Sequence, residues 1–340
     1  MISQDFVKFA ARASIFSLGF LALFALASLH FHYRIVARDN VFILLNAFRN
    51  ESIQPRVVIL GDSHATFDIL SAKFPREYYN FAYPSENWRK FVLRARATIN
   101  LKDSLEYIIV PLDYYQFSPT RARHVFFTDY LFFSPIEDIR DVYHPSLLEL
   151  FKAKVSSVLP LVSPSNRNTY RRVLGEDIYK FFGGKEKGKM IYIGEHNELR
   201  WEGESVVWSE LPGEKKRFAI FDREKEQFLK PFIDGDLYNV FEEFFSFAQA
   251  HDVKVIGVFY PTTLEYNEVL SRFDKETGNI TALGEKYKNL PLHATLDYRN
   301  VFDDHQEYFS DTDHLNRNGA GIFTEIILRD LEKIIEKTEP

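Results

Sequence analysis

Short apolar runs alternate with segments of helical periodicity along most of this chain, and this alternation constrains the fold more than any other feature. We predict strands over 57–60, 78–82, 105–111, 253–260 and 292–296. Apolar residues recur at helical spacing over 88–99, 237–250 and 321–335. Strand, helix and strand follow one another at intervals of about 25 residues, which is typical of a parallel sheet with right-handed crossovers. We therefore predict an α/β fold, a three-layer α/β/α sandwich around a mainly parallel five-stranded sheet.

The amino-terminal part contains a long uncharged run. Residues 13–33 include no Asp, Glu, Lys or Arg. About 20 apolar residues span a bilayer as a helix, so we predict a transmembrane helix or signal anchor over 13–33, after a short tail over 1–12. A cleaved signal peptide is one alternative, because Lys8 and Arg12 precede the run and residues 25–27 (Ala-Leu-Ala) resemble a cleavage site. A buried helix of a soluble protein is the other.

Basic residues on both sides of this run leave its orientation open. Lys8 and Arg12 precede it, whereas Arg34, Arg38 and Arg49 follow it. A short tail before a first apolar segment, followed by a large domain, is typical of an exported domain. We expect a single-pass protein of the cytoplasmic membrane, with its large domain on the extracytoplasmic side, periplasmic or extracellular.

The predicted organisation has three further parts. An apolar stripe at helical spacing predicts a juxtamembrane helix over 34–54. The α/β domain comes in two pieces, 55–120 and 226–340. Between them, residues 121–225 break the alternation and form an insertion that we interpret as a lid, a partner surface or a membrane-facing patch.

Composition excludes several classes of function. The net charge of -6 and the pI near 6.0 argue against nucleic acid as a partner. The chain has no cysteine, which excludes disulfides, thiolate catalysis and cysteine-ligated metals. The histidines show no convincing metal-ligand spacing, and there is no Gly-rich phosphate loop or dinucleotide fingerprint. For Asp303, Asp304 and His305 we favour a solvated loop over a cation site. We predict no metal and no cofactor.

Gly61, Asp62, Ser63 and His64 follow the first predicted strand. Open α/β sheets bind their ligands at the carboxyl ends of strands. A serine at that place is a candidate nucleophile if a nearby base removes its proton. The alternative is a plain turn followed by a helix N-cap.

A second motif precedes the last predicted helix. Asp311 and His314 are three residues apart, so their side chains can meet on a helical or turn-like segment. A carboxylate beside an imidazole fixes its tautomer and stabilises the imidazolium that forms when the ring accepts a serine proton. The alternative is that Asp311 or Asp313 caps the last helix and His314 has no role.

Together, the two motifs resemble those of the SGNH (GDSL-type) hydrolase superfamily, over about residues 55–120 and 250–335. The resemblance implies that both motifs meet at one edge of the sheet, with Ser63 as nucleophile, His314 as base and Asp311 as its orienting carboxylate. An early serine, a late Asp-x-x-His and an amino-terminal anchor are also similar to the membrane-anchored SGNH proteins of cell-envelope polysaccharide O-acylation, such as the D-alanyl transfer protein family.

The oxyanion hole departs from the family pattern. The family uses the backbone N–H of the nucleophile, a glycine after the second strand and an asparagine after the third. The corresponding positions here are Ser63, Ser85 and Asp113. The backbone N–H of Ser85 can still serve, but an ionised Asp113 cannot donate a hydrogen bond. Another residue therefore substitutes, or Asp113 has a different role, or activity is low.

Residues next to these motifs are candidates for substrate contact. We predict Asp62, His64, Tyr114, Tyr115 and Gln116, and the last three are also candidates to replace the missing oxyanion donor. For His64 the alternative is packing beside the turn.

Three hypotheses follow. The leading one is a membrane-anchored SGNH-like O-acyltransferase or esterase that acts on acyl esters of a cell-envelope polysaccharide through an acyl-enzyme. The second is a catalytically weak or inactive binding or assembly partner of a multispan membrane-bound O-acyltransferase. The third, a cytoplasmic esterase, requires the run over 13–33 to be a core helix. The expected partners are the polysaccharide or an acyl donor, that acyltransferase, and the membrane.

Overall fold

The computed structural model describes residues 4–49, 54–122, 130–131, 133–181, 191–193, 199–201, 205–228 and 233–337. The chain divides into two compact units. Unit 1 consists of Met1–Asn46 and Pro145–Gly188. Unit 2 consists of Ala47–His144 and Lys189–Pro340, and it contains every strand of the main sheet.

Unit 1 is built around one long apolar helix. Its elements are α1 (Gln4–Arg34), the 3₁₀ helix η1 (Val36–Arg38), most of α2 (Asn40–Phe48), α7 (Leu147–Val158), the 3₁₀ helix η5 (Pro160–Val162) and α8 (Pro164–Phe181). The predicted span 13–33 lies inside α1, which is long and apolar enough to cross a membrane. Its most apolar window has a mean hydropathy of 1.9 and is only 11% buried. A signal sequence has the same properties.

The segment over 34–54 is not the single helix that we predicted. The structure ends η1 at Arg38 and begins α2 (Asn40–Phe48) after an extended Asp39, with φ −69° and ψ 133°. The Asp39 carboxylate accepts the N–H of Val41 at 2.9 Å. An aspartate that caps a new helix leaves the helical conformation itself, which explains the break. Residues 50–53 lie outside the described part of the chain.

The main sheet of unit 2 confirms the predicted α/β fold. Its strands are β1 (Val57–Ile59), β2 (Tyr78–Asn80), β3 (Tyr107–Pro111), β6 (Lys254–Phe259) and β7 (Ala294–Asp297). They pair in the order β2-β1-β3-β6-β7, and every pairing is parallel. From β1 the chain crosses first to β2 on one side and then back to β3 on the other. Such a reversal opens a crevice at the carboxyl ends of β1 and β3.

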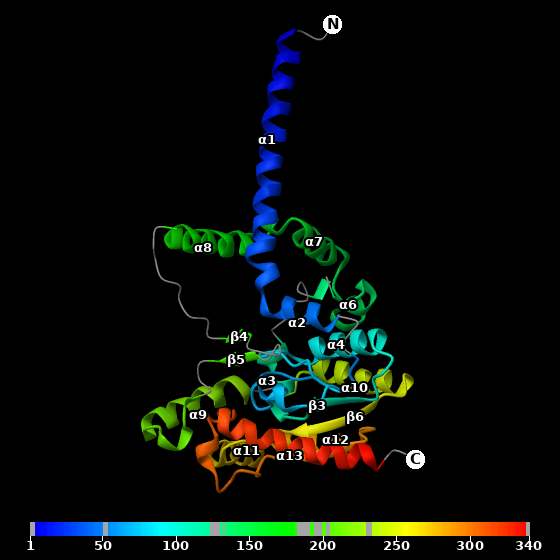
Figure 1. Cartoon of the computed structure of the whole chain (residues 1–340), viewed down its shortest axis with the longest axis vertical. Coiled ribbons are helices and arrows are strands. Elements are labelled where there is room, and N and C mark those ends of the chain that lie inside the picture. The colour runs from blue at the N-terminus through cyan, green and yellow to red at the C-terminus, as the bar shows by residue number, and fades with distance from the viewer. Residues whose placement is uncertain are drawn as a thin grey trace. The chain divides into compact units, whose positions relative to one another are not determined.

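Helices cover both faces of this sheet (Figure 1). Alternate residues of β1 and β3, such as Val57 and Ile109, pack in one buried cluster with Phe323 and Ile327 of α13 (Arg317–Glu336). On the other face lie α4 (Trp88–Leu101) and α10 (Gly235–Ala250), whose Trp88 and Phe241 rings are 4.4 Å apart. The remaining described helical elements of unit 2 are α3 (Ser63–Phe67), η2 (Ser71–Lys73), η3 (Tyr114–Phe117), α5 (Pro119–Ala122), α6 (Ile136–Tyr143), η8 (Trp208–Glu210), α9 (Gly213–Gln227), α11 (Leu264–Thr277), α12 (Asn279–Lys288) and η9 (Gln306–Tyr308).

The predicted insertion over 121–225 is shared between the two units. Helices α7 and α8 belong to unit 1, whereas α6 and α9 belong to unit 2. Unit 2 also includes the antiparallel pair β4 (Ile191–Ile193) and β5 (Leu199–Trp201). The last turn of α9 reaches the site described next.

Candidate active site

Ser63 lies at the carboxyl end of β1, at the first residue of α3. The turn before it requires glycine. Gly61 has φ +157°, and a Cβ at this position would lie 2.6 Å from the Cβ of Ala65. Asp62 caps α3, because its carboxylate accepts the N–H of His64 at 3.3 Å. The turn and cap therefore hold Ser63, half-buried, at the crevice between β1 and β3.

His314 lies on a tight loop just before α13. Phe309 and Leu315, both buried, pair across the loop as an isolated antiparallel bridge. Inside it, Asp311 Oδ1 accepts the backbone N–H groups of Asp313 at 3.0 Å and His314 at 2.8 Å. Helix α13 is capped by Asn316, not by Asp311 or Asp313. The loop thus presents Asp311 and His314 on one turn.

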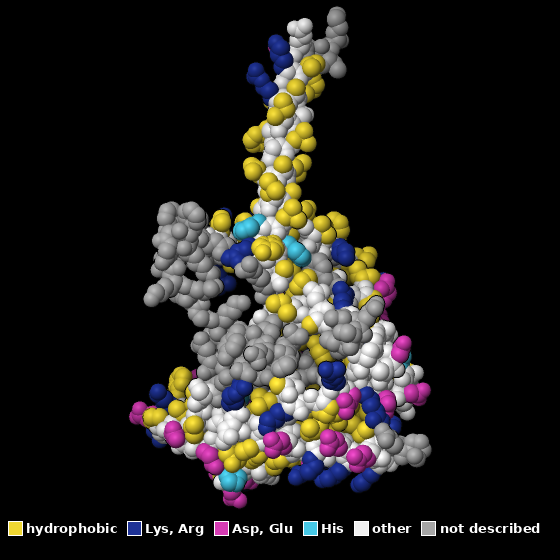
Figure 2. Space-filling view, in the orientation of Figure 1, with side chains coloured by type: hydrophobic (Ala, Val, Ile, Leu, Met, Phe, Trp, Pro, Cys, Tyr) yellow, Lys and Arg dark blue, Asp and Glu magenta, His cyan; other side chains and the backbone are white. Residues whose placement is uncertain are grey.

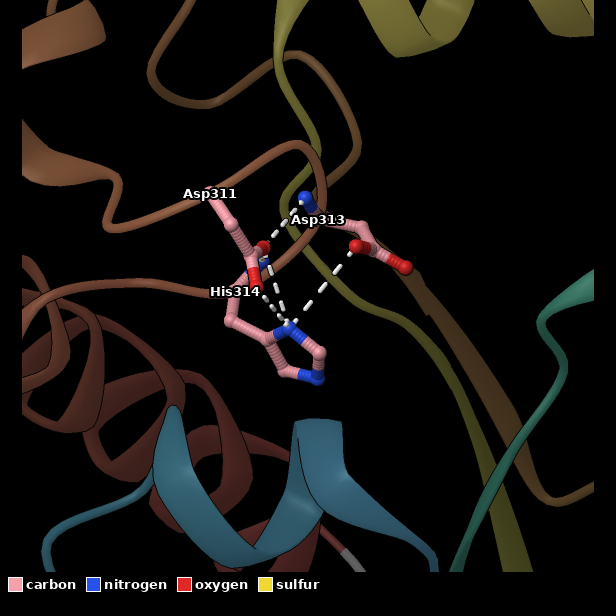
Figure 3. A group of neighbouring side chains, drawn as sticks. All are labelled: Asp311, Asp313 and His314. Carbon is pink, nitrogen blue, oxygen red and sulfur yellow. Dashed lines mark hydrogen bonds and ion pairs between the residues drawn. The ribbon is translucent and has the colours of Figure 1, made fainter. Parts of the chain in front are cut away.

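The structure brings the three predicted catalytic residues together. His314 Nε2 lies 2.8 Å from Ser63 Oγ, and His314 Nδ1 lies 2.9 Å from Asp311 Oδ2. Figure 3 shows the two carboxylates beside the same ring nitrogen, with the other nitrogen pointing away from both. Burial alone would lower the pKa of His314, but the charges of Asp311 and Asp313 outweigh it and raise that pKa above its ordinary value. The geometry is that of a serine, a general base and its orienting carboxylate.

Arg223 and Asp313 also lie beside His314, and the sequence motifs assigned neither residue to the site. Arg223 of α9 lies with Nη2 2.8 Å from Asp313 Oδ1 and 3.6 Å from Asp311 Oδ2. Asp313 Oδ1 is in turn 3.7 Å from His314 Nδ1. Burial alone would raise the pKa of Asp313, but Arg223 and His314 hold it well below the usual range. Asp313 therefore stays ionised beside the base.

Asp113 does not offer a donor to the site. Its Oδ2 lies 2.9 Å from His64 Nδ1, and its Oδ1 accepts the backbone N–H of Tyr260 at 3.3 Å. The other nitrogen of His64 is 3.4 Å from Asp313 Oδ2. Burial alone would lower the pKa of His64, but Asp113, Asp313 and Asp62 raise it well above its ordinary value. The different role that the sequence left open for Asp113 is thus to bind a buried His64.

The predicted substrate contacts lie behind the pocket at Ser63 and not on its walls. His64 is 1% exposed, and the Asp62 and Gln116 side chains are fully buried. Tyr115 Oη donates to Asp62 Oδ2 at 2.7 Å, and Tyr114 Oη accepts from Arg299 at 3.3 Å. The sequence placed these residues near the strand ends, but Asp62, His64 and Tyr115 turn inward, where the Tyr115 hydroxyl lies within hydrogen-bond distance of both of the others.

The pocket at Ser63 has a volume of about 240 Å³. The residues that line it are all polar or charged: Ser63, Ser85, Ser118, Thr120, Arg121, Arg223, Glu226 and Gln227. Ser85 has the left-handed conformation, with φ +62°, at the position where the SGNH family has glycine. The described walls are therefore polar.

Arg121 is held rigidly at this pocket. Its Nη2 donates to the buried Asp62 at 2.8 Å, and its guanidinium carbon lies 5.0 Å from the centre of the Tyr115 ring. Burial alone would raise the pKa of Asp62, but Arg121, His64 and the Tyr115 hydroxyl lower it. The Arg121 guanidinium is thus bound to Asp62, the residue that precedes the candidate nucleophile Ser63.

Asp311, Asp313 and His314 form the one group of three side chains in the described ranges whose atoms have metal-ligand spacing, within 4.8 Å of one another. The Arg223 guanidinium already lies against both carboxylates, and His314 Nε2 faces Ser63. The donor set therefore fits a serine site better than a cation site.

Comparisons with known proteins add little to this geometry. No family model and no curated protein matches the chain. Among solved structures, it is similar to a candidate acylhydrolase from Bacteroides fragilis NCTC 9343, at 13% identity and a TM-score of 0.33. The alignment covers 84% of this chain and 93% of that one. A likeness of this degree says nothing about activity.

Proposed function

We propose that this protein is a membrane-anchored, serine-dependent O-acyltransferase or esterase that acts on acyl esters of a cell-envelope polysaccharide. The observation that carries the proposal is the hydrogen-bonded series from Ser63 Oγ through His314 to Asp311, with distances of 2.8 Å and 2.9 Å. This arrangement supports removal of the serine proton by a base held in the correct tautomer.

In the first half-reaction, Ser63 Oγ attacks the carbonyl carbon of an ester or thioester and its proton passes to His314 Nε2. The imidazolium is stabilised by Asp311 at 2.9 Å and Asp313 at 3.7 Å. The bond between the carbonyl carbon and the leaving oxygen or sulfur then breaks, and His314 returns the proton to the leaving group. The product is an acyl group on Ser63.

In the second half-reaction, an acceptor hydroxyl gives its proton to His314 and attacks the acyl-enzyme carbonyl. The bond to Ser63 Oγ breaks, and the serine recovers the proton. A sugar hydroxyl as acceptor gives transfer, and water gives hydrolysis. The balance depends on how well water is excluded from the pocket.

The oxyanion needs donors that do not include Asp113, whose two oxygens are occupied by His64 and Tyr260. We assign the backbone N–H groups of Ser63 and Ser85. We add the Arg121 guanidinium, because it lines the same pocket and is fixed by Asp62. A preorganised cation stabilises the charge that develops on the carbonyl oxygen.

The polar pocket and the apolar α1 together support the substrate class. Hydroxyl, guanidinium, carboxylate and amide groups line the pocket, which suits a sugar ester better than a long acyl chain. Helix α1 would hold the enzyme at the membrane, where cell-envelope polymers are modified. An acyl donor supplied by a multispan acyltransferase is consistent with this location.

A fluorophosphonate probe tests the nucleophile directly. We expect the wild-type protein to be labelled at Ser63, and Ser63→Ala to lose all labelling and all acyl turnover. Ser118→Ala is the matched control, because it removes another hydroxyl from the same pocket and leaves the triad intact. Labelling of Ser63→Ala at the wild-type rate would sink the proposal.

The same experiment separates the second candidate function. The occupied Asp113 at the family's asparagine position favours an SGNH-fold binding or assembly partner of a membrane acyltransferase. Two results together would identify that role and exclude the enzymatic one. The folded wild-type protein would not react with the probe, and polymer acylation would survive in a strain that carries Ser63→Ala.

A further inference from the structure

Helix α7 of unit 1 has an apolar face that no described residue covers. Leu147, Leu148, Phe151 and Val158 are exposed by 79%, 59%, 66% and 68%. At about 100° per residue, these four side chains fall within an arc of about 100° on the helix. The helix buries a different face, which includes Leu150 and Ala153. The exposed apolar face is therefore additional to the one that holds α7 in place.

The position of α7 relative to α1 indicates what covers this face. The uncharged run over 13–33 is about 30 Å long as a helix, which matches the hydrocarbon thickness of a bilayer. Within α1, burial begins only at Ser28 and Phe31. Tyr170 of α8 packs there on Phe31, and its hydroxyl lies 3.0 Å from His30 Nδ1. Protein thus begins to cover α1 at the carboxyl end of the uncharged run.

The 3₁₀ helix η5 connects this place to α7. It follows α7 after one residue and contacts both α1 and α8. Lys152 and Lys154 of α7 are exposed and lie at the two edges of the apolar arc. Lysines at the edges of an apolar helical face extend to lipid phosphates while the face enters the acyl boundary. Figure 2 shows hydrophobic side chains along α1 and where α7 lies.

We propose that α7 lies in the plane of the membrane surface beside α1, with Leu147, Leu148, Phe151 and Val158 inserted into the lipid. The occupant of the face is the bilayer itself. This inference rests on the proposed membrane anchor. It predicts that the protein contacts the membrane through two elements far apart in sequence, a spanning helix and an interfacial one.

The chain has no cysteine, so a single cysteine reporter can be introduced without first removing native cysteines. We would label Leu147→Cys, Phe151→Cys and Val158→Cys on the apolar face, and Leu21→Cys in α1. The matched control is Ser156→Cys, which is half-buried and lies outside the apolar arc. A polarity-sensitive fluorophore is attached, and the full chain is reconstituted in phosphatidylethanolamine vesicles containing phosphatidylglycerol. Quenching by doxyl lipids is compared with quenching by aqueous iodide.

We expect blue-shifted emission and lipid quenching at 147, 151 and 158, and iodide quenching at 156. Replacing Leu148 by Lys in the Val158→Cys protein should reduce lipid quenching at 158. Iodide quenching at all four α7 positions would overturn the inference, and so would shielding from both quenchers, which would mean a protein partner. If the α7 inference fails in either way, lipid quenching at Leu21→Cys would still support α1 as a membrane anchor. Iodide quenching at Leu21→Cys would refute the anchor itself.

Discussion

At the residue scale, His64 is buried among carboxylates, which its place next to the candidate nucleophile in the sequence did not predict. It lies between Asp113 and Asp313, and its ring is 5.0 Å from that of His314. The carboxylates around it raise the pKa of His64 well above its ordinary value, which favours the charged ring, and that charge lowers the pKa of His314. We interpret His64 as a positioning residue whose charge lowers the pKa of the candidate base His314.

We expect His64→Gln to move the acid limb of the pH–activity profile upward. His314 accepts a proton only when neutral, so activity rises with pH through its pKa. Two charges 5.0 Å apart interact by about 3 kcal/mol at an effective dielectric constant of about 20, so losing one should shift the limb upward by roughly two pH units. The measurement is kcat/KM or probe labelling against pH.

The double variant His64→Gln/Asp113→Asn is the control. It removes one anion together with the cation, so the limb should return toward the wild-type position. A purely structural role for His64 would lower the amount of folded protein without moving the limb. An unmoved limb in folded His64→Gln would therefore refute this interpretation.

Arg121 carries the second prediction at this scale. Loss of one oxyanion donor typically costs about 10²–10³ in rate, and we expect that loss in Arg121→Gln. Because the change leaves Asp62 buried without its cation, the single variant can also unfold. Asp62→Asn/Arg121→Gln removes both charges. That double variant should fold, measured by circular dichroism, yet label as slowly as the single one; wild-type labelling would exclude Arg121 from the oxyanion hole.

At the element scale, the sheet and the two motif-bearing turns could be predicted because their signals are local. Apolar runs give β1, β3 and β6, and Gly61 ends β1 where its φ demands glycine. The Asp311–His314 pair is likewise a short-range turn. Spacing along the chain suffices for such features.

The partners of the site could not be predicted, because they depend on contacts between distant segments. Arg223 meets Asp313 across 90 positions (313 minus 223), and nothing in the sequence of α9 marks that arginine among its other charged residues. The inward turn of Asp113 follows from its buried partner His64. A strand end places a residue at the edge of the sheet, but packing decides where its side chain points.

Asp68 joins two elements and makes their association depend on pH. It follows α3, and its Oδ1 accepts the N–H of Leu315, just before α13, at 2.8 Å. Its Oδ2 has no hydrogen-bond partner among the described residues. Burial raises the pKa of Asp68 to about 7. Because the folded-state pKa lies above the unfolded value, the fold loses stability as pH rises from about 4 to about 7.

We expect Asp68→Asn to be more stable than wild type at pH 8, since the amide keeps the acceptor for Leu315 without a buried charge. A shift of about three pKa units corresponds to roughly 4 kcal/mol, an upper figure for this gain. The difference should shrink below about pH 4, where the wild-type acid is protonated in both states. Urea unfolding at the two pH values measures it. The exposed Asp304→Asn should change stability little, and an equal gain at both pH values would contradict the argument.

At the scale of the whole molecule, the candidate chemistry and the proposed membrane attachment belong to different units. Ser63, Asp311 and His314 lie in unit 2, as do all the residues that line the pocket at Ser63. Helices α1 and α7 belong to unit 1, which includes none of these site residues. Anchoring and catalysis should therefore be separable by deletion.

Deleting residues 1–27 tests this separation. The deletion removes the exposed part of α1 and keeps Ser28 and Phe31, which are buried in unit 1. We expect the shortened protein to be labelled by a fluorophosphonate at the wild-type rate, because no described site residue is lost. Loss of labelling in a folded deletion protein would mean that α1 contributes to the site.

The apolar face of α7 remains in the shortened protein, so we expect this protein still to bind vesicles. Alkaline carbonate should now extract it, because an interfacial helix is held only by its buried apolar area and its charge, whereas a spanning helix is not released.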